Sequence, residues 1–414
     1  MKKGVIMNGY RSGKRARPMS SRSIQELHYR EEGKLSYAAC FGLSAITLLY
    51  SLFIPLLLGR MQTRLEIWAW VMAITCIAFS WILVKKARWT VLTVLISLFF
   101  ISFTGSALIP AIVLGTLVAA CAYSSLVSAC SKVNLSFPIV TPLVIYGIST
   151  VLTLDPVYSL FSLIFILPAL VLGISCRLQA SLNVSLLSCT AAIIIPLISL
   201  CATSIYTVYG EISFEALTKY AASVRELFES YTQYYLAFTT KTELPQALYR
   251  EISEMVNSYV NLAPGIIVAV CLAFSFAVNS LKNDLLETQL GDSYISAKSK
   301  TISVSTVAAL LFVVAHIISF TTDASNNTTF IAVVFGNVSF MLVPGLALVG
   351  ITAVMNLNKK LGILSFIVFA LLIFVLFNAA SSFFILIALI GAFSVIVRSI
   401  DSWAKEFYGK GDNQ

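Results

Sequence analysis

Residues 89–131 read WTVLTVLISLFFISFTGSALIPAIVLGTLVAACAYSSLVSACS and contain no Asp, Glu, Lys or Arg. A membrane-spanning helix needs about 20 predominantly apolar residues, so this stretch is too long for one span and about right for two. We expect the division near Gly105-Ser106. Similar segments recur along most of the chain. The sequence therefore predicts an all-α fold, a polytopic transmembrane helix bundle of about 10 to 12 spans.

The predicted spans share an apolar run of suitable length with no charged residue deep inside it. A second long uncharged stretch, 361–397, divides at Asn378 into two spans. The spans are 36–58, 66–84, 89–105, 107–130, 136–153, 157–176, 181–206, 259–281, 301–321, 329–356, 361–378 and 382–398.

The overall composition supports the same fold class. Hydrophobic residues make up 58% of the chain, charged residues make up 11%, and the mean hydropathy is +0.89. A soluble domain needs roughly 25% charged residues to cover its surface, so lipid is the expected solvent. All 8 cysteines fall in apolar runs without a CxxC pair, which predicts small hydrophobic packing residues and no metal or disulfide framework.

The positive charges predict the orientation of the spans. With the N-terminus inside and the spans alternating, 22 Lys and Arg residues lie inside and 6 lie outside. This bias follows the positive-inside rule and requires both divisions of the uncharged stretches. We therefore expect a protein of the cell (cytoplasmic) membrane with both termini in the cytoplasm.

The spans and the polar segments between them predict a division of the chain into five parts. The parts are a basic cytoplasmic tail (1–35), a first transmembrane bundle (36–206), an extracytoplasmic amphipathic helical hairpin (207–258), a second transmembrane bundle (259–398) and a cytoplasmic tail (399–414).

The basic tail holds nine Lys and Arg residues against three acids. Such a tail is typical of a disordered segment that stays inside and approaches anionic lipid. A nucleic-acid-binding arm would need interleaved aromatic residues or a base-reading motif, and the tail has neither. We therefore predict the lipid bilayer as a partner and no nucleic acid.

The longest break between spans, 207–258, carries a helical pattern. Apolar residues recur at three- and four-residue steps from Phe214 to Tyr231 and from Leu248 to Tyr259. The segment is rich in Tyr and holds seven acids against four bases. We expect two amphipathic helices that lie on the outer leaflet or cap the bundle.

The motifs of several function classes are absent from the sequence. It contains no Walker A loop, no HExxH and no GxSxG, and no acid or base lies deep in a predicted span. Intramembrane charges usually mark proton relays and ion-coupled sites, and membrane enzymes need paired carboxylates or a His/Glu cluster. The sequence predicts no enzyme, no catalytic residue, no cofactor and no metal.

Prolines interrupt two spans at corresponding positions. The five spans before 207–258 start inside and the last five start outside, which is the parity of an inverted repeat. The third span of the first set holds Pro138 and Pro142, and the third of the second set holds Pro344-Gly345. Broken helices at matching positions mark substrate sites in transporters, whereas the alternative is that these prolines only kink packed helices.

Three polar residues inside spans are further candidates. His316 is the one titratable candidate in a span, and Asn279 and Asn337 can face other helices. An Asn in a span most often bonds across a helix interface, and a lone His most often packs, so substrate contact is the alternative for each. Gly345 and Gly350 are expected close-packing positions. The candidate substrate-binding residues are Asn279, Asn337, Pro138, Pro142, Pro344, Gly345 and His316.

Three motifs in the second half of the chain carry a family resemblance: Tyr259-Val-Asn-Leu-Ala-Pro264-Gly with Asn279, Asn337 with Val343-Pro-Gly345-Leu-Ala-Leu-Val, and Leu389-Ile-Gly391-Ala-Phe with Arg398. With these motifs, the layout between about residues 36 and 402 resembles the YybS-like family of predicted bacterial multi-pass membrane proteins. The chain departs from the family at Ser299-Lys300-Thr301-Ile302 and at Ser394. The resemblance implies a polytopic bacterial inner-membrane protein without a known reaction, in a layout similar to small-molecule uptake components.

Two functions remain open at this point. The first is a transporter or substrate-binding membrane component for a small, weakly charged solute. The second is a non-enzymatic membrane scaffold or assembly factor that binds membrane protein partners through the outer hairpin and the basic tail. Copurification of a bound solute favours the first function, and capture of a protein partner by the hairpin favours the second.

Overall fold

The computed structural model describes the chain in separate stretches, and every regular element within them is a helix. The predicted all-α fold class is therefore confirmed. The expectations for the tail 1–34, for the spans 66–84, 89–105 and 361–378, and for both divisions fall mostly or wholly outside these stretches. The described residues are 35–60, 75, 78–79, 82, 108–129, 136–240, 246–291, 295, 302–322, 330–361 and 380–408.

The helices follow the predicted spans closely wherever the structure describes them. The largest differences are in α10, which extends beyond its span at both ends, and in α14, which continues past its span. The helices are α2 (Tyr37–Arg60), α5 (Leu108–Ala129), α6 (Ser136–Thr153), α7 (Pro156–Arg177), α8 (Leu182–Tyr209), α9 (Phe214–Thr240), α10 (Gln246–Leu290), α11 (Thr306–Thr321), α12 (Phe330–Leu361) and α14 (Ala380–Tyr408).

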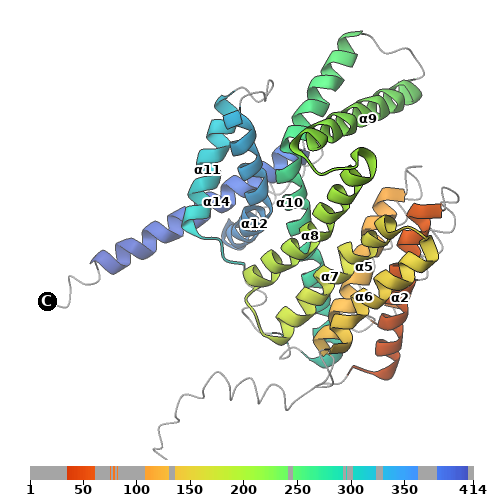
Figure 1. The fold of residues 1–414 in the computed structure, drawn as a ribbon. Helices are drawn as coiled ribbons and strands as arrows, with labels where there is room; N and C mark the ends of the chain where they lie inside the picture. The colour runs from red at the N-terminus through yellow and green to blue at the C-terminus, as the bar shows by residue number, and fades with distance from the viewer. Residues whose placement is uncertain are drawn as a thin grey trace, which may run out of the picture.

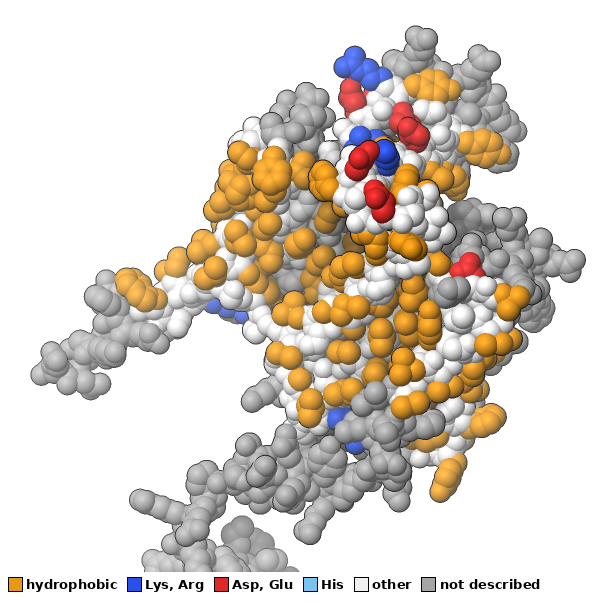
Figure 2. Space-filling view, viewed as in Figure 1, with side chains coloured by type: hydrophobic (Ala, Val, Ile, Leu, Met, Phe, Trp, Pro, Cys, Tyr) orange, Lys and Arg blue, Asp and Glu red, His pale blue; other side chains and the backbone are white. Residues whose placement is uncertain are grey.

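Five helices in the described part of the chain are long and apolar enough to cross a membrane. Shorter apolar segments lie in α2, α5, α6 and α11. Figure 2 shows apolar side chains over the sides of the bundle and acidic side chains gathered at the end that carries α9. The chain is therefore a membrane protein. The five long apolar segments are Ser159–Arg177, Leu182–Tyr209, Tyr259–Leu290, Phe330–Val354 and Phe384–Trp403.

The helices form two groups that meet at α10 (Figure 1). Helices α2, α5, α6, α7 and α8 pack against one another, and α11, α12 and α14 form the second group. Helix α10 packs against α5 and α8 of the first group and against α12 of the second. Helix α10 therefore lies between the two groups and packs against both.

Helix α10 corrects one sequence expectation. It runs for 45 residues without interruption, and Lys282, which we expected in an inside loop, lies within its apolar segment. The Lys282 side chain is only 2% exposed. The expectation that no Asp, Glu, Lys or Arg lies deep in a span therefore fails at Lys282, because the helix continues past the predicted end of the span at residue 281. The predicted span ended just before Lys282, because a charged side chain is costly in lipid. The helix can continue past Lys282 because this side chain is buried against other helices and does not face lipid.

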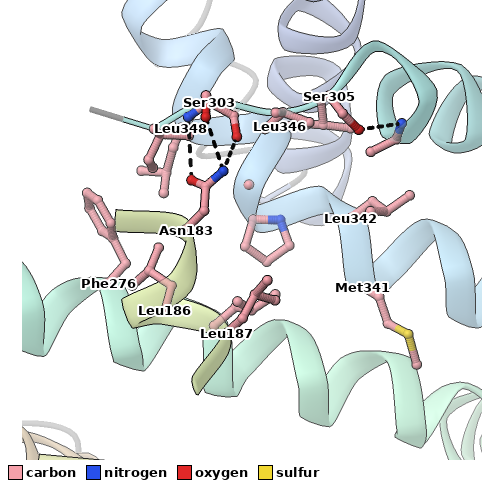
Figure 3. A pocket seen from close by; sticks show the side chains of 16 residues that line it. Asn183, Leu186, Leu187, Phe276, Ser303, Ser305, Met341, Leu342, Leu346 and Leu348 are labelled. Atoms are coloured by element: carbon pink, nitrogen blue, oxygen red, sulfur yellow. Dashed lines mark hydrogen bonds between the residues drawn. The ribbon is translucent and has the colours of Figure 1, made fainter. Parts of the chain in front are cut away.

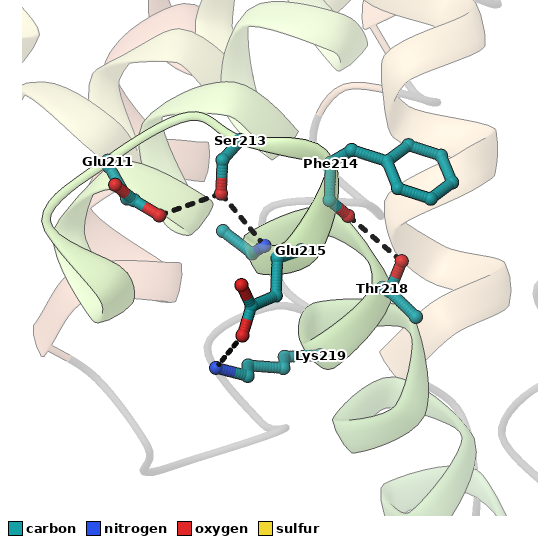
Figure 4. A network of polar contacts seen from close by, with 7 residues as sticks. Glu211, Ser213, Phe214, Glu215, Thr218 and Lys219 are labelled. Atoms are coloured by element: carbon teal, nitrogen blue, oxygen red, sulfur yellow. Dashed lines mark hydrogen bonds and ion pairs between the residues drawn. The ribbon is translucent and has the colours of Figure 1, made fainter.

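The outer segment forms the two expected helices, α9 and the first part of α10. The chain leaves α8 at Gly210, whose positive φ of 77° suits glycine, and re-enters a helix at Ser213. The Ser213 hydroxyl accepts a hydrogen bond from the Ala216 N–H at 3.1 Å and donates to Glu211 at 2.7 Å (Figure 4). This side-chain cap fixes where α9 begins.

Helices α12 and α14 cross at glycines. A Cβ added at Gly391 would overlap the Leu346 carbonyl oxygen and lie 2.9 Å from the Gly350 nitrogen. A Cβ at Gly350 would overlap the carbonyl oxygen of Ile387 in the same way. The expected close packing at Gly350 is confirmed. Gly345 differs, because its nearest neighbour beyond its own helix would be Val304 at 3.8 Å, which is ordinary contact.

Candidate functional site

A cavity of about 240 Å³ lies between α8, α10, α12 and the segment that leads into α11. Figure 3 shows side chains from all four elements converging on it. Most of its walls are Leu, Val, Phe and Met side chains, with Pro344 and Gly345 of α12 among them. Its polar members are Asn183, Ser303 and Ser305.

The lead-in segment of the cavity is not helical, and side chains hold it in place. The Asn183 amide donates to the Ser303 carbonyl oxygen and, at 3.2 Å, to the Ser303 hydroxyl. The Ser303 N–H lies 3.5 Å from the Asn183 Oδ1 in return. Ser305 caps α11 by accepting from the Ala308 N–H at 3.2 Å. Asn183 therefore joins the two helix groups at the rim of the cavity (Figure 3).

Asn337 is placed elsewhere, in a structural role. Its Oδ1 accepts from the Gly265 N–H at 2.6 Å, and its Nδ2 donates to the Asn261 carbonyl oxygen at 3.0 Å. In a regular helix, the Gly265 N–H would donate to the Asn261 carbonyl. The Asn337 amide therefore bridges these two backbone groups of α10 in place of their direct hydrogen bond. The bridge lies next to Pro264, which has no N–H of its own. Asn337 therefore bonds across a helix interface, as an Asn in a span most often does.

The other predicted residues whose side chains the structure describes lie apart from the cavity walls. His316 stacks on Phe312 with ring centroids 5.8 Å apart, and its Nδ1 lies 3.5 Å from the Ser339 hydroxyl, which is a packing arrangement. Pro142 is buried in α6, and the side chain of Pro138 lies outside the described part. Of the six candidates whose side chains the structure describes, Pro344 and Gly345 are the two that line this cavity.

Asn279 belongs to a second site that the sequence analysis missed. Its Oδ1 accepts from the Lys282 Nζ at 2.9 Å, and both side chains are buried. Ser275, Asn279, Lys282 and Asn283 follow one another at helical spacing and are all less than a tenth exposed. They form a polar stripe along one face of α10. The helical spacing of these four polar residues was the signal in the sequence that could have predicted this site.

The polar stripe faces α5 and α8. The Ser275 hydroxyl lies 3.4 Å from the Thr190 hydroxyl of α8, within hydrogen-bond distance. Three cysteine thiols, one each from α5, α7 and α8, lie close enough to Lys282 to interact with it electrostatically. We call this region the polar seam: Cys121 of α5, Cys176 of α7, Cys189 and Thr190 of α8, and the four stripe residues of α10.

Two buried polar atoms, one on α10 and one on α5, have unused hydrogen-bonding capacity. The Asn283 Oδ1 and the Ser124 hydroxyl are buried and have no hydrogen-bond partner among the described residues. Buried polar atoms in proteins are nearly always hydrogen-bonded, so such atoms point to a missing water or ligand. Within the described stretches, no group of three His, Cys, Asp or Glu side chains is arranged to hold a metal ion.

Comparison with known proteins gives no further guide to the site. No protein-family model, no curated protein and no solved structure matches the chain. The resemblance to the YybS-like family therefore stays a prediction.

Proposed function

We propose that this membrane protein is a transporter or substrate-binding membrane component that takes up a small, weakly charged solute at the cavity beside Pro344-Gly345. The single observation that carries the proposal is the position of the cavity, between the two helix groups and beside a non-helical segment. Transporters commonly bind substrate where two sets of helices meet and where a helix is interrupted.

The size and lining of the cavity indicate the kind of solute. Ligand pockets for drug-sized molecules span about 300 to 1,000 Å³, so a cavity of about 240 Å³ suits a smaller molecule. Among the residues that the structure describes, no Asp, Glu, Lys, Arg or His lines it. A largely apolar solute with one or two hydrogen-bonding groups would match the apolar walls and the Asn183, Ser303 and Ser305 side chains.

The proposal can be tested by filling the cavity. A side chain at Gly345 would point toward Val304 in the cavity wall, with room for its first carbon. We expect Gly345→Leu to abolish the rise in melting temperature that a bound solute causes in the purified full-length protein. Gly147→Leu is the matched control, because a Cβ there has nothing within 4 Å. Equal solute responses in both variants would argue against this cavity as the site.

The proposal includes the setting of the protein: a non-enzymatic component of a bacterial cytoplasmic membrane with both termini inside. Orientation is testable with single cysteines at Ser230 in α9 and at Ser181 before α8, both exposed, in a background without native cysteines. We predict that an impermeant thiol reagent labels the Ser230 position from outside, and the Ser181 position only after permeabilisation. Labelling of both from outside would contradict the orientation.

A second candidate function rests on the surface of α9. Leu227, Phe228, Tyr231 and Tyr234 are each more than half exposed, and α9 touches the bundle mainly near its start. Large exposed apolar side chains often mark interaction surfaces, so α9 could hold a membrane protein partner and make the chain a scaffold. Phe228→Ser with Tyr231→Ser should then release a copurifying partner, whereas the Gly345→Leu variant should keep it.

A further inference from the structure

We propose that α9 attaches to the membrane surface beside the end of α8, with an apolar face that inserts among the lipid headgroups. The residues that carry the inference, Leu227, Tyr231 and Tyr234, are not among those that line the cavity beside Pro344-Gly345. The inference therefore does not rest on the proposed transport function. A protein partner, which the second candidate function places on the same helix, is the other occupant that the test distinguishes.

The first support is the place where α9 meets the bundle. Helix α8 has 28 residues and is about 42 Å long, close to the roughly 40 to 45 Å of a bilayer with its headgroups. Its last residue, Tyr209, therefore lies at the level of the headgroups. The Tyr209 hydroxyl lies 3.4 Å from the Ser223 hydroxyl of α9, within hydrogen-bond distance. Figure 1 shows α9 lying across this end of the bundle, so it lies at the headgroup level as well.

The second support is the side of α9 that faces the bundle. Ala216 is only 3% exposed, and Ser223, which contacts Tyr209, lies within about 20° of it around the helix at 100° per residue. In the following turns Leu227, Tyr231 and Tyr234 lie within about 60° of Ala216. They are 68%, 65% and 70% exposed. The side that faces the bundle at the start of α9 therefore continues as an uncovered apolar face.

The charged side chains of α9 lie away from this face. Glu226 and Glu229 are turned by about 80° and 140° from Ala216, and Arg225 lies about opposite it. An amphipathic helix of this kind lies in the interface with its apolar face buried at the headgroup boundary. Tyrosine is enriched there because its ring is apolar and its hydroxyl is polar. The composition of the face therefore suits lipid headgroups.

The apolar surface of α8 leads directly onto α9. Tyr206 and Val208 in the last turn of α8 are exposed, and so are Ile212 in the connection and Phe214 at the start of α9. Large apolar side chains exposed on a spanning helix face lipid, because lipid is the solvent of its sides. The lipid around the end of α8 therefore adjoins α9 and is the nearest apolar environment for its exposed face.

The test places labels on opposite sides of α9 in the full-length protein. The protein is reconstituted in phosphatidylcholine nanodiscs in a background without native cysteines, and a fluorescent label is attached at Tyr234→Cys or at Glu226→Cys. We expect a nitroxide carried by the lipid near its headgroup to quench the label at position 234 much more strongly than the label at position 226. Acrylamide, which quenches from water, should act in the opposite order.

Paired substitutions test whether the apolar face makes the attachment. Leu227→Ser with Tyr231→Ser should remove most of the lipid quenching at position 234. Glu226→Gln with Glu229→Gln is the matched control on the charged side and should keep it. Acids outnumber bases on α9 by three to two, so added anionic phosphatidylglycerol should not strengthen the quenching.

The outcomes separate lipid from the other occupants. If acrylamide reaches both labels equally, α9 stands clear of the membrane and the proposal is overturned. If neither quencher reaches the label at position 234, protein covers the face, and the second candidate function takes its place. Equal lipid quenching of the two labels, quenching that requires phosphatidylglycerol, or quenching that survives Leu227→Ser with Tyr231→Ser would each contradict attachment through the apolar face.

Discussion

The polar seam and the crossing of α12 with α14 hold their helices together in opposite ways. In the polar seam, α10 meets α5 and α8 through hydroxyl, amide, thiol and ammonium groups, such as the Lys282–Asn279 hydrogen bond. At the crossing, Gly350 and Gly391 bring two helix backbones into direct contact, with Ala388 and Ala392 buried beside them. Helices α8, α10, α12 and α14 at these interfaces are long and apolar enough to cross a membrane, and α5 holds a shorter apolar segment.

The difference shows two solutions to the same physical problem. Lipid tails are as apolar as leucine, so membrane helices associate through close packing and hydrogen bonds rather than through the hydrophobic effect. The crossing uses close packing and leaves no room for a ligand. The polar seam uses hydrogen bonds and leaves the Asn283 Oδ1 without a partner among the described residues. Close packing therefore holds the helices together at the crossing, and hydrogen bonds hold them together in the polar seam.

The largest expected effect is at the crossing. In Gly391→Ala the new methyl group would overlap the Leu346 carbonyl oxygen, and a backbone atom cannot move aside as a side chain can. We expect the free energy of unfolding to fall by about 3 kcal/mol or more, measured by denaturation in detergent. Gly147→Ala, where the added carbon meets nothing within 4 Å, is the control. Similar losses in the two variants would remove the distinction between the crossing and an open surface.

The next effect tests the joint between α10 and α12. Asn337→Leu removes the acceptor for the Gly265 N–H and the donor to the Asn261 carbonyl, and the Gly265 N–H loses the partner that it has in the structure. Such a loss costs about 1 to 3 kcal/mol of the free energy of unfolding. Asn257→Leu, on the outer part of α10 and without a hydrogen bond in the described structure, should cost much less. A neutral Asn337→Leu would show that the amide is not needed to complete the helix.

The helix positions were predictable from sequence because a run of apolar residues has one stable arrangement in lipid, a helix of spanning length. The same rule failed at Lys282. A charge ends a predicted span, but whether its side chain faces lipid, water or another helix depends on tertiary packing. The stripe formed by Ser275, Asn279 and Lys282 had the spacing of one helix face, yet its neighbours on α5 and α8 are far away in sequence.

The cavity shows the same limit. Pro344 and Gly345 were found from their helix-breaking chemistry, and both line the cavity. The sequence analysis did not identify Asn183 and Ser303. Their role at the cavity depends on the hydrogen bond between them, which joins residues 120 positions apart in the sequence. Asn337 was a candidate for the right reason, a polar group inside a span. Its hydrogen-bond partners, the Gly265 N–H and the Asn261 carbonyl of α10, could be identified only from the structure.

An effect of similar size to that of Asn337→Leu sharpens the account of the polar seam. Asn279→Leu removes the one acceptor that the described residues offer to the Lys282 ammonium, and hydrogen bonds to charged groups contribute about 1.5 to 3 kcal/mol. In a Lys282→Met background the same change should cost far less, because no charge remains to be satisfied. A double-mutant cycle on the free energy of unfolding measures this coupling. Additive effects would show that the two side chains do not depend on each other.

The smallest effect concerns a lysine in the opposite environment. Lys219 pairs with Glu215 at 2.8 Å one turn away on α9, and both side chains are more than half exposed (Figure 4). Water solvates each group when the other is removed, so an exposed pair of this kind contributes only about 0.3 to 0.5 kcal/mol. We expect Lys219→Met to change the free energy of unfolding by no more than that, and added salt to remove the difference. If Lys219→Met instead costs as much as Asn279→Leu, exposure does not separate the two lysines. The contrast between a solvated ion pair and a buried charge would then lose its basis.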